Sequence, residues 1–197
     1  NGRTIGEVPL EEWCGDGVVV DISDEVSDFS LYSPEMLMKK ADIRKGDILI
    51  INTGYHKYGW DQPQADEVRY MVKHPGPDAE FHKWAQEMKF KWIGVDCGSA
   101  DHPMNTILRD WHPKLFAKAE AKLKETHGKA WDEYYPQEEY YQVMHLKMFP
   151  MGIVHAENIG GDIDKLNNKR TWIGLFPWRA IELESCISRI VAFEFDK

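Results

Sequence analysis

The sequence has few cysteines: Cys14, Cys97 and Cys186 are the only three, and they are widely spaced. An odd and sparse set does not build a disulfide framework and is typical of a reducing compartment. No run of about 18 apolar residues occurs, so we expect no membrane span. The first residues show no basic segment followed by an apolar one, as a secretory signal would. We therefore expect a cytoplasmic protein.

Basic residues are fewer than acidic ones. The chain has 24 Lys and Arg against 33 Asp and Glu, a net charge of −9. Proteins that bind nucleic acids normally present a basic surface to the phosphates, and no basic stripe is visible here. Nucleic acid is therefore not an expected partner.

Apolar residues make up 43% of the 197 residues, which suits one globular domain with a buried core. Runs of β-branched residues and alternating patterns predict strands at residues 17–23, 48–54, 92–97, 143–149, 171–176 and 187–195. Helices are expected near residues 34–41, 67–72, 77–89 and 115–126. Strands alternate with helices early and cluster late, which favours an α/β fold with a mixed sheet.

Two further regions are rich in side chains that can bind or react. Residues 55–77 are expected to form a long aromatic loop that includes the short helix near 67–72, and in it Tyr55 and Trp60 are suited either to stacking on a flat substrate or to anchoring a core or interface. Asp101 and His102 follow the strand at 92–97, where α/β folds place active residues. Alternatively, Asp101 caps a helix that begins near Pro103.

His145 and Glu157 lie twelve residues apart, and imidazole and carboxylate are a usable pair of ligands for a divalent cation. The alternative is that His145 caps a strand and Glu157 pairs with a nearby base. His155 faces the same side as Glu157 if the segment is extended, where it would either orient the carboxylate or pack as a structural histidine. Asn158 and the glycines at 160–161 shape a pocket floor or form a plain turn.

Three segments in this order resemble the metal-dependent cyclase family: GDILIINTGY at 46–55, WIGVDCGSADHP at 92–103 and HAENIGG at 155–161. This family includes bacterial kynurenine formamidase and isatin hydrolase, and the resemblance is greatest to the isatin hydrolase branch. It covers essentially all 197 residues, which we expect to form a single cyclase-like domain.

The resemblance implies a swivelling β/β/α domain with a mixed sheet that assembles into homo- or hetero-oligomers. It implies hydrolysis of an amide, often a cyclic amide or a formamide, with bound manganese or zinc. His145 and Glu157 match two metal ligands of the family. The resemblance further suggests substrate-binding or ligand-supporting roles for a set of other residues: His155, Asn158, Asp101, His102, Tyr55 and Trp60.

The family's hallmark, of the form His-x-Gly-Thr-His-x-Asp-x-Pro-x-His, does not occur in these 197 residues. In relatives it lies just before a segment like residues 1–5 and supplies further ligands and an acid/base histidine. We therefore expect the domain to be incomplete at its N-terminus. A second polypeptide would then carry the motif, unless that segment is removed from a precursor or lost.

The predicted function is metal-dependent hydrolysis of an amide C–N bond, with a cyclic amide such as an isatin-like lactam as the small-molecule substrate. The alternative is a non-catalytic subunit or degenerate relative with a binding or assembly role. A third reading is a metal-free cysteine enzyme in which Cys97 works with His102.

Overall fold

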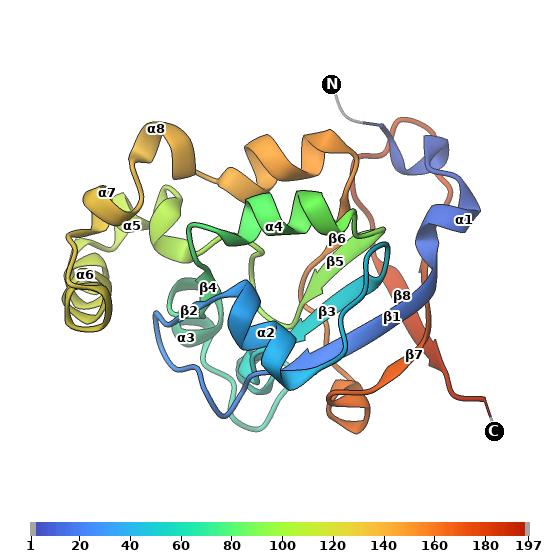
Figure 1. The fold of residues 1–197 in the computed structure, drawn as a ribbon, viewed down its shortest axis with the longest axis horizontal. Helices are drawn as coiled ribbons and strands as arrows, with labels where there is room; N and C mark the ends of the chain where they lie inside the picture. Colours follow the sequence, from blue (N-terminus) through green and yellow to red (C-terminus); the bar gives the residue numbers. More distant parts are fainter. Residues whose placement is uncertain (1–2, 196–197) are drawn as a thin grey trace.

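The computed structural model describes residues 3–195 (Figure 1). The first two residues of the segment 1–5, which was compared with relatives above, lie outside the described residues. A six-stranded mixed sheet has the order β6-β5-β3-β1-β7-β8. The parallel strands are β1 (Cys14–Asp21), β3 (Ile48–Asn52), β5 (Trp92–Val95) and β6 (Val154–Ala156). Strands β7 (Arg170–Pro177) and β8 (Ser188–Phe193) are antiparallel additions. The short strands β2 (Leu31–Tyr32) and β4 (Gly76–Pro77) form a separate pair. This is the mixed α/β fold expected from the sequence.

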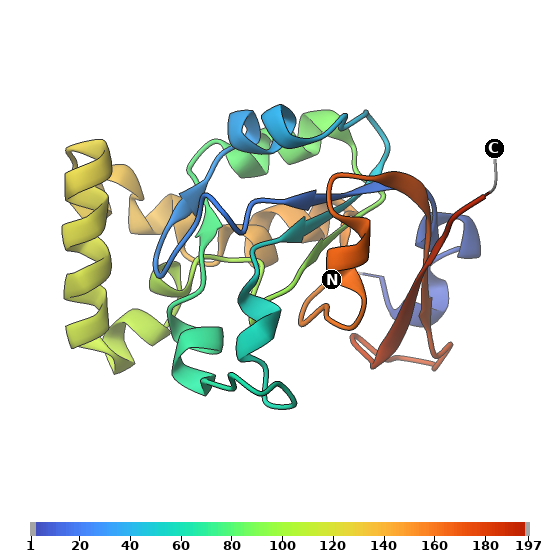
Figure 2. The same cartoon turned by 90° about the horizontal axis from the view of Figure 1, so that it is seen from below.

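The helices are short except for one. They are α1 (Leu10–Trp13), α2 (Pro34–Lys40), α3 (Glu67–Val72), α4 (Phe81–Met88), α5 (Leu108–Trp111), α6 (Pro113–His127), α7 (Trp131–Tyr134) and α8 (Gln137–Tyr140). None of the helices in residues 3–195 is long and apolar enough to cross a membrane. Helix α6 stands at one end of the molecule, away from the sheet (Figure 2).

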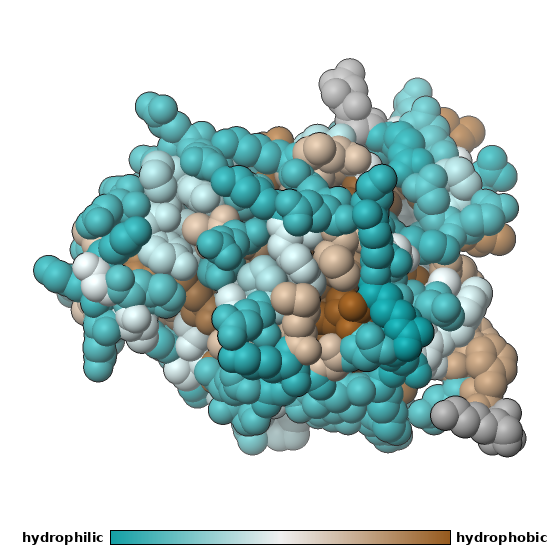
Figure 3. Space-filling view, viewed as in Figure 1, coloured by the Kyte–Doolittle hydropathy of each residue, from teal (hydrophilic) through white to brown (hydrophobic). Residues whose placement is uncertain are grey.

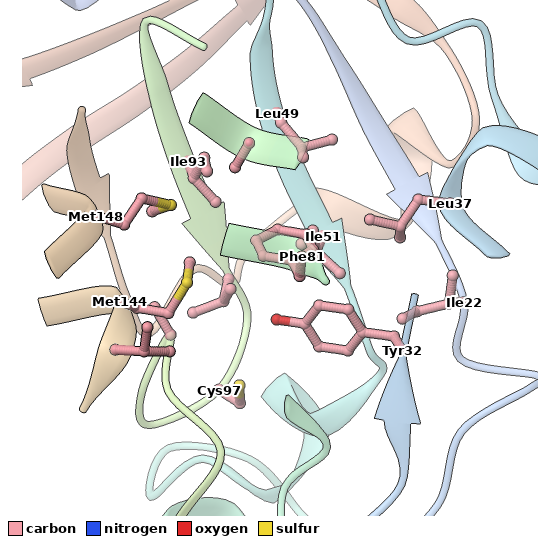
Figure 4. Close-up of a cluster of buried hydrophobic side chains, with 14 of the residues drawn as sticks. Ile22, Tyr32, Leu37, Leu49, Ile51, Phe81, Ile93, Cys97, Met144 and Met148 are labelled. Atoms are coloured by element: carbon pink, nitrogen blue, oxygen red, sulfur yellow. The ribbon is translucent and has the colours of Figure 1, made fainter. Parts of the chain in front are cut away.

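The sheet has a buried core on each face. One core joins strand residues such as Ile51 and Ile93 to Leu37 of α2, Phe81 of α4 and Met144 (Figure 4). Helices α2 and α4 cover this face, and their outer surface is mostly hydrophilic (Figure 3). The opposite core is built around side chains from α1, from β1, β3, β5 and β7, and from the 3₁₀ turn Ile163–Leu166: Trp13, Val19, Ile48, Ile50, Trp92, Ile163, Ile173 and Leu175. Because both faces are covered, the sequences of β3 and β5 are nearly continuous runs of buried apolar residues.

The strand predicted at 143–149 is wrong. Residues Met144–Met148 form a single helical segment of π geometry. Met144 and Met148 are both fully buried against the sheet, and a separation of four residues places two side chains on one face of a helix. The short apolar run does not distinguish the two periods by itself. As a result, His145 projects from a helix end instead of a strand.

The helix expected from residue 77 begins instead at Phe81. Gly76 and Pro77 pair with β2, and the carboxylate of Asp78 accepts the backbone N–H groups of Glu80 and Phe81. The predicted cap near Pro103 is also different. His102, and not Asp101, precedes the 3₁₀ turn at Pro103–Asn105, and its Nδ1 accepts the N–H of Met104 at 3.1 Å.

His102 is 1% exposed and packs on the ring of Trp131, and burial lowers its pKa to about 3. Below pH 6.5 the unfolded chain takes up a proton on this imidazole while the folded chain does not. The free energy of unfolding therefore falls as the pH falls from 6.5 towards 3.

We predict that His102→Asn, which keeps an acceptor for the cap, flattens this dependence by up to about 1.4 kcal/mol per pH unit between pH 6 and 4.5. Urea unfolding of the metal-free protein at several pH values measures the slope. A variant with the same slope as the parent would show that His102 is protonated in the folded state.

Candidate metal centre

The polar residues of interest lie at one edge of the sheet. Strands β1, β3, β5 and β6 are parallel, so their carboxyl ends meet there. Residues that follow β5 and β6 face each other across this edge, because β6 pairs with β5 in the register Ile93↔His155. This is the usual position of a ligand site in an open α/β sheet.

His145 reaches this edge from the helical segment that packs beside β5. Its Nδ1 lies 2.7 Å from Oδ2 of Asp101, which is 1% exposed. Its other nitrogen, Nε2, lies 3.4 Å from Oε1 of Glu157. His145 is therefore held between two carboxylates, one buried and one partly accessible.

His155 and Glu157 come from β6 and the residue that follows it. They point to the same side, as expected for an extended segment, and His155 Nε2 lies 3.9 Å from Glu157 Oε1. The ring of Phe149 stacks on the ring of His155 at a centroid distance of 3.9 Å. Glu157 Oε1 accepts the backbone N–H of Ala100 at 2.8 Å. Both side chains are thus fixed from one side and open on the other.

The three side chains fit a divalent cation. Ligand atoms of His145, His155 and Glu157 all lie within 4.8 Å of one another. Tetrahedral ligands at the usual zinc bond lengths are separated by roughly 3.4 Å, which is close to the distances observed here without any ion. Two imidazoles and one carboxylate form a set of ligands that both zinc and manganese accept. The structure therefore adds His155 as a third candidate ligand.

The surroundings shift the pKa values of the three side chains in different directions. Burial lowers the pKa of His155 to about 4, with the neighbouring His145 adding to the effect, so this imidazole is neutral at pH 7. Burial raises the pKa of Glu157. The hydrogen bond to Asp101 raises the pKa of His145. Crowding three such groups has a cost without a cation, since a cation would satisfy the lone pairs of all three.

Asn158 directly follows the cluster in the left-handed conformation, with a φ of 60°. Its backbone N–H donates to Cys97, and the hydroxyl of Tyr70 on α3 donates to its Oδ1 at 2.9 Å. Asn tolerates this conformation better than most residues. The turn ends strand pairing and leaves Glu157 at the sheet edge. Tyr70 was missed by sequence reasoning, since a single tyrosine in a short helix carries no signal of a contact with a residue 88 positions away.

The other predicted residues lie as follows. Tyr55 is 3% exposed and donates to Asp28, which matches the alternative that it anchors the core. Trp60 is 92% exposed, and its role in substrate binding stays a prediction. His102 has the capping role described above, and its Nε2 lies 3.4 Å from the carbonyl of Phe29, which accounts for both ring nitrogens. It is therefore not the partner of Cys97.

A second polar group lies at the same edge. Asp96, fully buried after β5, accepts from His56 Nδ1 at 2.9 Å, and His56 Nε2 lies 3.3 Å from Asp164. Asn52 at the end of β3 also donates to Asp164 and to Asn167. These contacts fasten the segment that crosses from β6 to β7 over the strand ends.

Comparison with known proteins identifies the family of the chain. The Cyclase family model matches residues 1–102, slightly more than half of the sequence. The chain belongs to this family. No curated protein matches at a significant level.

Solved structures show the same fold. The chain resembles isatin hydrolase A from Ralstonia solanacearum with a TM-score of 0.67 and 18% identity, over 98% of this chain and 64% of that one. It resembles isatin hydrolase A from Labrenzia aggregata with a TM-score of 0.66 and 16% identity, over 96% and 64%. A potential metal-dependent hydrolase with cyclase activity matches with a TM-score of 0.61 and 13% identity, over 100% and 73%. The chain therefore spans about two thirds of the length of these proteins.

The thiol of Cys97 is 1% exposed, and burial raises its pKa. A buried neutral thiol is a poor nucleophile. We predict that iodoacetamide modifies Cys186, which is partly exposed, well before Cys97 in the native protein. Peptide mass spectrometry after timed labelling measures this order. Faster labelling of Cys97 would revive the reading of a cysteine enzyme.

Proposed function

We propose that this chain forms part of a metal-dependent hydrolase that cleaves an amide C–N bond. The substrate class that we infer is a cyclic amide, such as an isatin-like lactam. The observation that carries the proposal is the convergence of His145, His155 and Glu157 on one point at the sheet edge. Membership of the cyclase family and the fold shared with isatin hydrolases support it.

A bound divalent cation would supply the Lewis acidity that polarises a carbonyl group and activates water. The residues of this chain would hold it through Nε2 of both imidazoles and the carboxylate of Glu157. About a third of each histidine side chain and a fifth of that of Glu157 are exposed, so a substrate carbonyl has access to the centre. Tyr70 and Asn158, joined by a hydrogen bond beside Glu157, would contact the substrate.

We further propose that a second polypeptide segment carrying the family's histidine and aspartate motif completes the coordination and supplies the acid/base histidine. The 197 residues do not contain that motif. The assembly would then be a homo- or hetero-oligomer in which this chain contributes part of the centre. The sparse free cysteines favour a cytoplasmic location.

A binding or assembly role without catalysis is the second candidate. The two candidate functions predict different native assemblies, with or without a motif-bearing segment and a metal ion. Intact-mass spectrometry of native material would show the hydrolase as this chain with a motif-bearing segment and about one metal ion. Native material in which the motif and the metal are both missing would favour the non-catalytic role.

The substitution Glu157→Gln tests the centre. It keeps an oxygen that accepts the N–H of Ala100 but removes the charge that a cation needs. We predict that metal content and the rate of isatin ring opening both fall by roughly tenfold or more, judging from the effects of substitutions around metal ligands. Metal analysis and absorbance assays of the native assembly, reloaded with Mn²⁺ or Zn²⁺ after chelation, provide the measurements.

Glu87→Gln is the matched control. Glu87 is exposed on α4, so this substitution removes the same charge away from the candidate ligands. It should leave metal content and rate unchanged. If Glu157→Gln behaves like this control, the assignment of the metal centre is wrong.

A further inference from the structure

The carboxylate of Asp101 is directed entirely at one short segment. Its Oδ1 accepts the N–H of Met144 at 3.0 Å, and its Oδ2 accepts the N–H of His145 at 3.2 Å. The same Oδ2 lies 2.7 Å from His145 Nδ1. Asp101 is 1% exposed, and among residues 3–195 its ion-pair partner is His145. A buried carboxylate without a Lys or Arg partner is costly unless its oxygens accept several hydrogen bonds, as they do here.

These contacts determine where the proton of the His145 ring lies. An ionised carboxylate only accepts hydrogen bonds, so Nδ1 must be the donor. In the neutral ring, Nε2 then carries the free lone pair, and this atom faces Glu157 at 3.4 Å. The bonds to the two backbone N–H groups also fix the start of the helical segment, and with it the position of the ring.

We propose that Asp101 is the positioning residue of the metal centre. It holds His145 with its proton on Nδ1 and with Nε2 directed at the cation, and its charge makes this nitrogen a stronger ligand. The proposal deepens the proposed function and rests on it for the identity of the ligand, but the position of the proton is a property of the metal-free chain.

Asp96 offers a matched comparison within the same sheet edge. It is fully buried, and it also accepts from backbone N–H groups, those of Thr53 and His56, and from Nδ1 of His56. The far nitrogen of His56, however, faces Asp164, which is mostly exposed and is not one of the three candidate ligands. The two aspartates therefore share the same local arrangement but differ in what lies beyond the histidine.

The experiment compares Asp101→Asn with Asp96→Asn. The asparagine amide can donate to Nδ1 of His145, which moves the ring proton to Nε2 and removes the lone pair from the ligand position. We predict that Asp101→Asn weakens the binding of Mn²⁺ and Zn²⁺ to the native assembly by roughly 10- to 100-fold in calorimetric titrations. Asp96→Asn should change this affinity less than threefold. Both variants should lose thermal stability to a similar extent.

A second measurement does not depend on metal, and its first part needs only the parent protein. Two-dimensional ¹H–¹⁵N spectra of the imidazoles in the metal-free parent protein should show the proton of His145 on Nδ1, and Asp101→Asn should move it to Nε2. A parent protein with the proton on Nε2 would overturn the proposal, as would an Asp101→Asn variant that binds metal like the parent. If His145 has the predicted ring state but the native assembly binds no metal, the metal centre itself is refuted and the orienting contact stands.

Discussion

The candidate site depends on the parallel pairing of β6 with β5. This pairing brings residues 155–157 beside the loop that follows β5, and two consecutive residues of that loop hold two of the candidate ligands. The N–H of Ala100 binds Glu157, and the side chain of Asp101 binds His145. Gly94 allows the close approach, because a Cβ at this position would collide with Ile159 on the segment after β6. A single loop thus aligns ligands that lie twelve residues apart in the sequence.

The pKa values of the histidines depend on burial and on contact with a carboxylate. His74, His102 and His155 lie in surroundings that lower their pKa values to about 4, 3 and 4, so they remain neutral at physiological pH. The exceptions are His56 and His145, whose pKa values are raised by hydrogen bonds to Asp96 and Asp101. Both of these aspartates lie in the loop that follows β5. Asp96 and Asp101 thus oppose the effect of burial, which lowers the pKa values of the other three imidazoles.

Much of the fold could be predicted from the sequence because its signals are local. The apolar run at β3 and the Ser33 cap of α2, which accepts the N–H of Met36, depend on neighbouring residues alone. The helix at Met144–Met148 could not be predicted with the same security, because burial against β5 and capping by Asp101 decide its geometry. Both partners lie more than forty residues away in the sequence.

The same distinction applies to the site. The sequence singled out His145 and Glu157 by their match to a family, and the structure brings them within 3.4 Å. The sequence did not show that His155 offers a third nitrogen at the same point. It also did not show that Asp101 binds His145 instead of capping the turn that begins at Pro103. These relations arise from strand register and from contacts across the sheet edge. Spacing along the chain carries no information about them.

The most direct test of the metal centre is anomalous diffraction from crystals of the native assembly grown with Mn²⁺. We expect a single strong peak at this sheet edge, bonded at about 2.1 Å to Nε2 of His145, to Nε2 of His155 and to the carboxylate of Glu157. A peak bonded elsewhere, for example between His56 and Asp164, or no peak within bonding distance of the three side chains, would contradict this expectation.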